Sequence, residues 1–231
     1  MQTTISATQS VPDVLRLSPP VMGVDGYRGG WIAVETGANG ETTARTAPSL
    51  AGLLDTDARV IGIDIQIGIP DSAARAADTA ARAFVGRRAS SVFPTPIRAA
   101  LEAASYAEAV AVARERTGKG ISQQSYALRK RILEVDAVAR EDERVVEVHP
   151  EVSFCLLAGR PLAHSKHSGA GLAERRRLLS RAGLRIPRPA GVPEADVLDA
   201  AVVAWSAARV AAGEARTFPE GHADRIGAIR G

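Results

Sequence analysis

The most constraining feature of the sequence is one aspartate in each of two almost wholly apolar segments. The segment VMGVDGYRGGWIAV begins at Val21 and carries Asp25, and the segment VIGIDIQIGIP begins at Val60 and carries Asp64. Short runs rich in valine and isoleucine are typical of interior β-strands covered on both faces. A carboxylate in such a strand loses its hydration, so it needs a cation or hydrogen-bond donors as partners. The two segments therefore predict buried strands whose acids have a specific task.

Glycine precedes each of these aspartates by two positions. Because side chains alternate along a strand, Gly23 shares a face with Asp25, and Gly62 shares a face with Asp64. A glycine in a strand leaves room beside its neighbours, either for an ion or for the close approach of another backbone. The paired GVD and GID motifs therefore predict a crowded or ion-binding face.

The remaining periodicity predicts an α/β fold. Strand patterns occur at 21–25, 29–36, 41–47, 60–67 and 144–149. The second and third are separated by Ala38-Asn39-Gly40, and an Asn-Gly pair between alternating segments is a strong hairpin signal. Helical patterns occur at 71–84, 97–104, 105–117, 122–139, 171–182 and 194–212. We expect a mixed sheet flanked by helices in one domain, 19–231, with a helical insertion around 70–140 and a disordered extension at 1–18.

Three further acids join the two aspartates as candidates. Glu147 lies inside the apolar run VVEV, and Asp196 and Asp199 lie on one side of the helix predicted at 194–212. Each has a simpler interpretation. Asp25 could cap a turn, Glu147 could pair with a buried arginine, and Asp196 could complement a helix dipole.

Convergence of these acids favours a metal site. The apolar runs 21–25, 60–67 and VVEV contain no basic residues beside their acids, and clustered carboxylates without cations repel one another. Small residues on the last helix would let it lie close to the strands and bring its acids to their ends. Hard oxygen ligands of this kind suit Mg²⁺ or Mn²⁺. We expect Asp25, Asp64 and at least one of Asp196 and Asp199 to lie together, with Glu147 nearby.

Seven motifs in order resemble the DUF429 family of predicted RNase H-like nucleases. The resemblance runs from about Val21 to Gly227 and rests on GVDGYRGGWIAV, IGIDIQIGIPD, SVFPTPIRAAL, TGKGISQQSYAL, EVDAVAR, VVEVHPEVSF and DVLDAAVVAWSA. It implies a ribonuclease H-like fold, with a mixed five-stranded sheet of an antiparallel hairpin plus parallel strands, flanked by helices.

The resemblance also implies roles for the acids. Asp25, Asp64, Asp196 and Asp199 match the metal-binding acids of the superfamily, and Glu147 belongs to the EVHPE motif of the family. We take all five as candidate catalytic residues. One position departs from the family pattern, because Gln66 stands where IDIPIGLP has its first proline.

Candidate substrate-binding residues are Lys119, Gln124 and Arg28. Lys119 lies between two glycines just before a predicted helix start, where a loop can cradle a phosphate or simply enter the helix. The loop lacks the spacing of a P-loop. His149 is either a core histidine, a partner of the site or a proton carrier, and His164-Ser-Lys-His167 is interpreted as a surface loop.

Composition limits the other classes of protein to which the chain could belong. With 29 basic and 26 acidic residues, the formal charge of +3 says little about partners. A lone Cys155 excludes an intramolecular disulfide and a cysteine-rich zinc site. The first residues show no secretory signal pattern, and no apolar run approaches the roughly 18 residues of a membrane span. We expect a cytoplasmic protein.

The interpretation that unites these features is a metal-dependent hydrolase, a nuclease that cleaves phosphodiester bonds in nucleic acid. In it, Asp25 would lie between two ions, with Asp64 and Asp199 (or Asp196) outside them. The alternatives are an actin-like protein that handles nucleotides or phosphates, and a non-catalytic RNase H-like scaffold. The sequence does not distinguish DNA from RNA.

Overall fold

A computed structural model describes residues 19–37 and 41–231 of the chain. The extension predicted at 1–18 and the Asn39-Gly40 turn lie outside the described residues. The strands on either side of that turn, at 30–36 and 42–47, are paired antiparallel as the hairpin signal predicts.

The sheet is mixed and open, with seven strands in the order β3-β2-β1-β4-β5-β7-β6. The neighbours β3, β2 and β1 are antiparallel, β1, β4, β5 and β7 are parallel, and β6 is antiparallel to β7. The strands are β1 Val21–Tyr27, β2 Gly30–Thr36, β3 Thr42–Ala47, β4 Val60–Ile63, β5 Val145–Val148, β6 Thr217–Phe218 and β7 Ile229–Arg230.

The resemblance implied a sheet of five strands, and this number must be corrected, because β6 and β7 extend the sheet to seven strands. Each of these strands has two residues, too few to show alternation. The strand expected at 60–67 also ends early, at Ile63. Asp64 N–H still donates to the Val24 carbonyl, but Ile67 N–H turns to the Glu147 carboxylate, so the chain has left the sheet.

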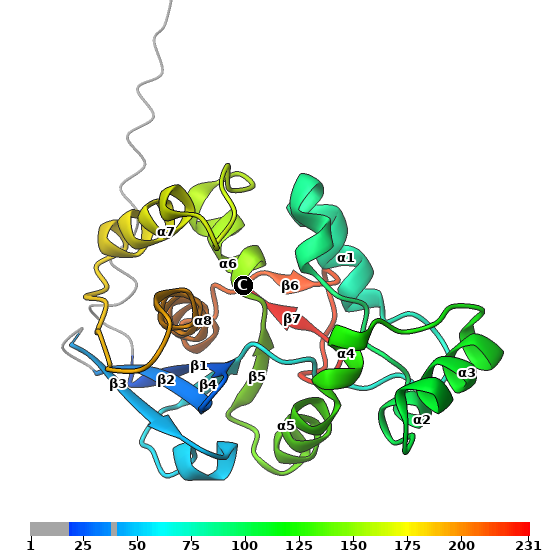
Figure 1. Ribbon diagram of the computed structural model, residues 1–231. Helices are drawn as coiled ribbons and strands as arrows, with labels where there is room; N and C mark the ends of the chain where they lie inside the picture. The colour runs from blue at the N-terminus through cyan, green and yellow to red at the C-terminus, as the bar shows by residue number, and fades with distance from the viewer. Residues whose placement is uncertain (1–18, 38–40) are drawn as a thin grey trace, which may run out of the picture.

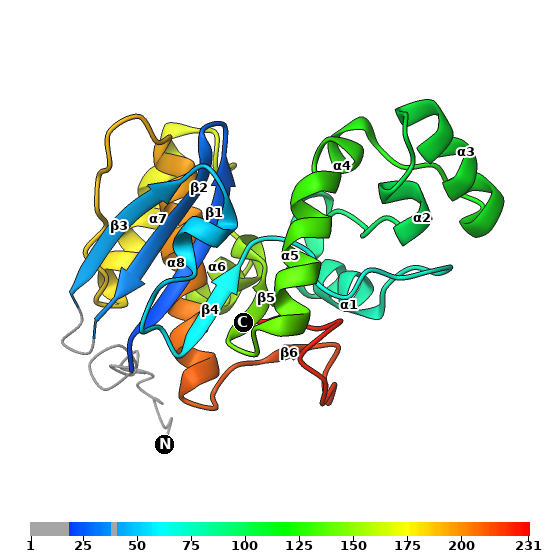
Figure 2. The same ribbon diagram turned by 90° about the horizontal axis from the view of Figure 1, so that it is seen from below.

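Helices cover both faces of the sheet. They are α1 Ala76–Val85, α2 Arg98–Leu101, α3 Tyr106–Thr117, α4 Gln123–Ala127, α5 Arg129–Glu141, α6 Pro150–Ala158, α7 Gly169–Arg181 and α8 Glu194–Ala211. Figure 1 shows α8 and α7 on one side of the sheet and α5 on the other. The first five helices lie between β4 and β5, at the position of the predicted insertion, and Figure 2 shows α2 and α3 lying away from the sheet. Within the described ranges, no helix is long and apolar enough to cross a bilayer.

Three helix predictions differ from the structure. The first helix begins at Ala76 instead of about Asp71, because Arg75 remains extended and its guanidinium binds buried carboxylates. The helix expected at 122–139 is divided at Leu128 into α4 and α5. Helix α6 was not predicted, although Pro150 at its first position and an apolar run behind it are a helix-start signal.

Helix α8 lies directly on the glycines of β1 and β4. A Cβ atom added to Gly23 would lie 2.1 Å from the Ala204 nitrogen and 2.2 Å from the Ala200 oxygen, and one added to Gly62 would lie 2.8 Å from Val203 Cγ1. The two glycines are also paired with each other in adjacent strands. The room that they leave is therefore occupied by the backbone of α8, and the expected close approach of this helix is confirmed.

Gly23→Ala should displace α8 and lower the free energy of unfolding by about 3 kcal/mol, because the added methyl group meets backbone that cannot turn aside. Gly169→Ala is the matched control, since a Cβ atom there meets nothing within 4 Å at the start of α7. Urea unfolding of the two variants measures the difference. A Gly23→Ala protein as stable as the control would contradict the packing described above.

Candidate metal centre

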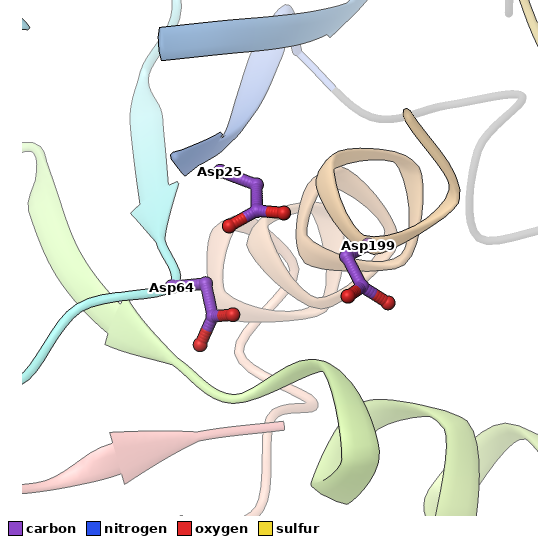
Figure 3. A group of neighbouring side chains, drawn as sticks. All are labelled: Asp25, Asp64 and Asp199. Carbon is purple, nitrogen blue, oxygen red and sulfur yellow. The ribbon is translucent and has the colours of Figure 1, made fainter. Parts of the chain in front are cut away.

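The acids of β1 and β4 meet at the carboxyl ends of two adjacent parallel strands. Val24 is paired with Ile63, so the next residue of each strand is an aspartate, Asp25 or Asp64. Helix α8 crosses this edge of the sheet near its own N-terminus, where it carries Asp199. Figure 3 shows the three side chains projecting from these elements into the same space.

The three carboxylates are close enough to share an ion. One oxygen from each of Asp25, Asp64 and Asp199 can be chosen so that all three lie within 4.8 Å of one another. Asp25 and Asp199 are buried, with 7% and 1% of their surfaces exposed, and Asp64 is partly buried. The predicted convergence of acids from both strands and the last helix is confirmed.

Burial makes this cluster electrostatically unfavourable on its own. The pKa of Asp25 is raised well above its ordinary value by burial and by repulsion from Asp64 and Asp199. Burial and Asp199 raise the pKa of Asp64 to about 7, although Lys166 opposes them. The fully ionised cluster is therefore unfavourable by itself, and a bound cation would relieve this repulsion.

One protein cation reaches the cluster. Lys166 Nζ donates to Asp199 Oδ2 at 2.6 Å. Burial alone would lower the pKa of Lys166, but Asp199, Asp64 and Asp25 outweigh it and raise that pKa. The other oxygen, Asp199 Oδ1, is buried and has no hydrogen-bond partner among the described residues. An orphaned buried carboxylate oxygen beside two further acids fits a divalent cation that takes oxygen ligands.

Asp196 and Glu147 have different positions from the triad. Asp196 borders the same cleft, and burial raises its pKa, but it is not one of the three converging acids. Glu147 forms a buried ion pair with Arg75, which binds both of its oxygens at 2.5 and 2.6 Å. Arg75 also contacts Asp78, and Ile67 N–H donates to Glu147. The interpretation of Glu147 as the partner of a buried arginine therefore matches the geometry.

The triad opens onto a cleft of about 430 Å³. Its wall includes the basic residues Arg88, Arg131 and Lys166. Arg131 Nη2 donates to the carbonyl oxygens of Tyr27 and Gly30, which orients its guanidinium. The cleft is therefore lined by both acidic and basic side chains, and two of the basic ones, Arg88 and Lys166, are paired with the acids Glu151 and Asp199 of the same lining.

The predicted substrate-binding residues separate into two groups. Gln124 borders the cleft, whereas Lys119 and Arg28 are exposed residues that do not line it. Gln66 also borders the cleft, and its Oε1 atom is buried without a hydrogen-bond partner in the described chain.

The structure places His149 and the 164–167 loop, whose roles the sequence left open, beside the cleft. Both ring nitrogens of His149 are engaged, one with the Glu151 N–H and the other with the Ser91 carbonyl, which favours a structural histidine. Burial lowers its pKa. The loop is exposed at His164, Ser165 and His167, as expected of a surface loop, and it also brings Ser165, Lys166 and His167 to the border of the cleft. No spacing pattern marks the pairs that Lys166 forms with Asp199 and Arg75 with Glu147, since these partners are distant in sequence.

Comparisons with known proteins identify one family. The family described as "Protein of unknown function (DUF429)" matches residues 23–224. This match covers most of the chain, so the chain belongs to that family. Neither the curated proteins nor the solved structures include a match.

The pH dependence of stability tests the acid cluster. With the pKa of Asp64 raised from 3.8 to about 7, the folded protein keeps a proton that the unfolded chain releases. In the absence of metal, its free energy of unfolding should therefore fall as the pH rises from about 4 to about 7, by at most about 1.4 kcal/mol per pH unit for this carboxyl. Asp64→Asn should flatten this slope in urea unfolding with a chelator present. Equal slopes for the two proteins would count against the cluster.

Glu147→Gln tests the buried ion pair. The free energy of unfolding should fall by about 3 kcal/mol, because Arg75 loses a negative partner in a site from which water is excluded. Glu143→Gln is the control, since Glu143 is exposed. A stable Glu147→Gln protein that has lost activity would instead give Glu147 a direct part in the chemistry.

Proposed function

We propose that this member of the DUF429 family is a divalent-metal-dependent hydrolase that cleaves phosphodiester bonds in nucleic acid, with Mg²⁺ or Mn²⁺ as its cofactor. The observation that carries the proposal is the convergence of Asp25, Asp64 and Asp199 within 4.8 Å at the end of a cleft. The raised pKa values of Asp25 and Asp64 support it, because a bound cation would relieve the repulsion among these buried carboxylates.

The sheet supports an RNase H-like fold as part of this proposal. Its first five strands have the order β3-β2-β1-β4-β5, with the antiparallel strands β1, β2 and β3 followed by parallel β4 and β5. This is the arrangement of hairpin and parallel strands that the resemblance implies, and β7 and β6 continue it at one edge. The acids lie where the parallel strands end, which is where open α/β sheets bind their ligands.

The residues that line the cleft would have two separate roles, holding the cation and binding the phosphates of the substrate. Asp25, Asp64 and Asp199 would hold the cation, and Asp196 borders the same space. When bound, a divalent ion supplies Lewis acidity to a phosphodiester and activates water. Arg131 lines the cleft and donates to carbonyl oxygens, which carry no full charge, so its positive charge would be available to a phosphate and would give affinity without sequence readout.

Asp25→Asn decides whether the triad is catalytic. The substitution keeps the size of the side chain and removes one of three repelling charges, so the metal-free protein should fold and be at least as stable. Its Mn²⁺-dependent cleavage of labelled nucleic acid should fall by at least ~100-fold. Asp57→Asn is the control, because Asp57 is exposed and outside the cleft.

The assay should include single-stranded, duplex, hybrid and branched nucleic acids, with ATP hydrolysis measured in parallel. Loss of cleavage in the folded Asp25→Asn protein supports the nuclease. ATP turnover without cleavage would favour the actin-like alternative. A metal-loaded wild-type protein that is inactive on every substrate would contradict the proposal and favour a non-catalytic scaffold.

A further inference from the structure

The ammonium group of Lys166 contacts Asp199, one of the three acids proposed to hold the cation. The chain has three lysines, at 119, 130 and 166, and Lys166 Nζ lies 2.6 Å from Asp199 Oδ2. Its charge also acts on Asp64 and Asp25, the other two members of the triad. Among the described residues, Lys166 is therefore the lysine whose ammonium group contacts the triad.

The backbone that carries Lys166 is firmly held. Arg88 and Arg175 both donate to the carbonyl oxygen of His164, and both are paired with the buried carboxylate of Glu151. The Ser165 carbonyl accepts hydrogen bonds from the backbone and hydroxyl of Ser168, which lies on the other side of Lys166 in the sequence. These hydrogen bonds fix the backbone position of Lys166, whereas its long side chain is free to change its conformation.

The two ends of the Lys166–Asp199 pair differ in exposure. The Asp199 side chain is 1% exposed, whereas that of Lys166 is 38% exposed. The carboxylate is therefore fixed inside the protein, and the ammonium has a path to water along its own side chain. A pair of this kind opens by movement of the lysine, which leaves Asp199 in place beside Asp25 and Asp64.

We propose that Lys166 is the counter-ion of the metal-free acid cluster, and that a divalent cation binds by displacing its ammonium group from Asp199. This inference rests on the metal site of the proposed function. A divalent ion that shared Asp199 would lie within a few ångströms of the ammonium, where like charges repel strongly because little water separates them. Lys166 thus lowers the affinity of the site for metal and stabilises the protein in the absence of metal.

If Lys166 instead helped Asp199 to bind the metal, its removal would have the opposite effect on metal affinity. If Lys166 only oriented Asp199 through Oδ2 while Oδ1 bound the ion, its removal would weaken metal binding, as the loss of partners of metal ligands does by about 10–100-fold. Displacement predicts tighter binding when the charge is removed. The sign of the change in affinity therefore separates the two roles.

The test is Mn²⁺ binding by isothermal titration calorimetry to wild type, Lys166→Met and Lys166→Gln. Both neutral variants should bind Mn²⁺ at least ~10-fold more tightly than wild type. Lys166→Gln retains a hydrogen-bond donor and serves if Lys166→Met does not fold without metal. Lys166→Arg, which keeps the charge, should remain within ~3-fold of wild type. Lys130→Met is the matched control, because Lys130 is exposed and outside the cleft.

Thermal unfolding gives an independent measurement. In a chelating buffer, Lys166→Met should melt at a lower temperature than Lys130→Met, and Mn²⁺ should raise its melting temperature by more than that of wild type. If wild type binds Mn²⁺ and both neutral variants bind it with equal or weaker affinity, the proposed displacement is wrong, whereas the metal site itself remains supported. Absence of Mn²⁺ binding in wild type and variants alike would overturn both this inference and the proposed function.

Discussion

The contact between the backbone of α8 and the two paired glycines of the sheet determines the geometry of the whole site. Gly23 and Gly62 remove the side chains that would otherwise separate the helix from β1 and β4. The helix can then cross the sheet close enough for Asp199 to reach the acids that end these strands. Any larger residue at Gly23 would meet backbone atoms of α8. The position of Asp199 on this helix therefore depends on the absence of a side chain at Gly23, and not on an attractive contact.

Close packing at the strand ends creates the electrostatic problem that defines the site. Burial of Asp25 and its proximity to Asp64 and Asp199 raise its pKa, so the cluster is costly in its fully ionised form. Within the described part of the chain, one ammonium group, that of Lys166, is bonded to the cluster, and Asp199 Oδ1 has no hydrogen bond. Three carboxylates with one partly exposed lysine are under-compensated, and this shortage of positive charge is what a divalent ion would correct.

The sequence predicts the parts of this arrangement that depend on local pattern. Alternation placed Gly23 with Asp25 and Gly62 with Asp64, and the register of β1 and β4 agrees with that placement. Two-residue strands such as β6 and β7 carry no period, and the Glu147–Arg75 and Asp199–Lys166 pairs join residues far apart in the chain. Long-range ion pairs leave no trace in spacing, so the cations of the site could be found only from the fold. The same limit left Glu147 among the candidate catalytic acids, with a buried arginine as one of its open interpretations.

Glu147 and the triad show how one protein treats buried acids in two ways. Glu147 receives a guanidinium on both oxygens and a backbone N–H, so most of its hydrogen-bonding capacity is used inside the protein. Asp199 receives one flexible ammonium, and Asp25 accepts a hydrogen bond from its neighbour Gly26. A planar guanidinium held by several carboxylates is difficult to displace, whereas a partly exposed lysine is not. The acids that remain available to an external cation are therefore those whose protein partner can leave.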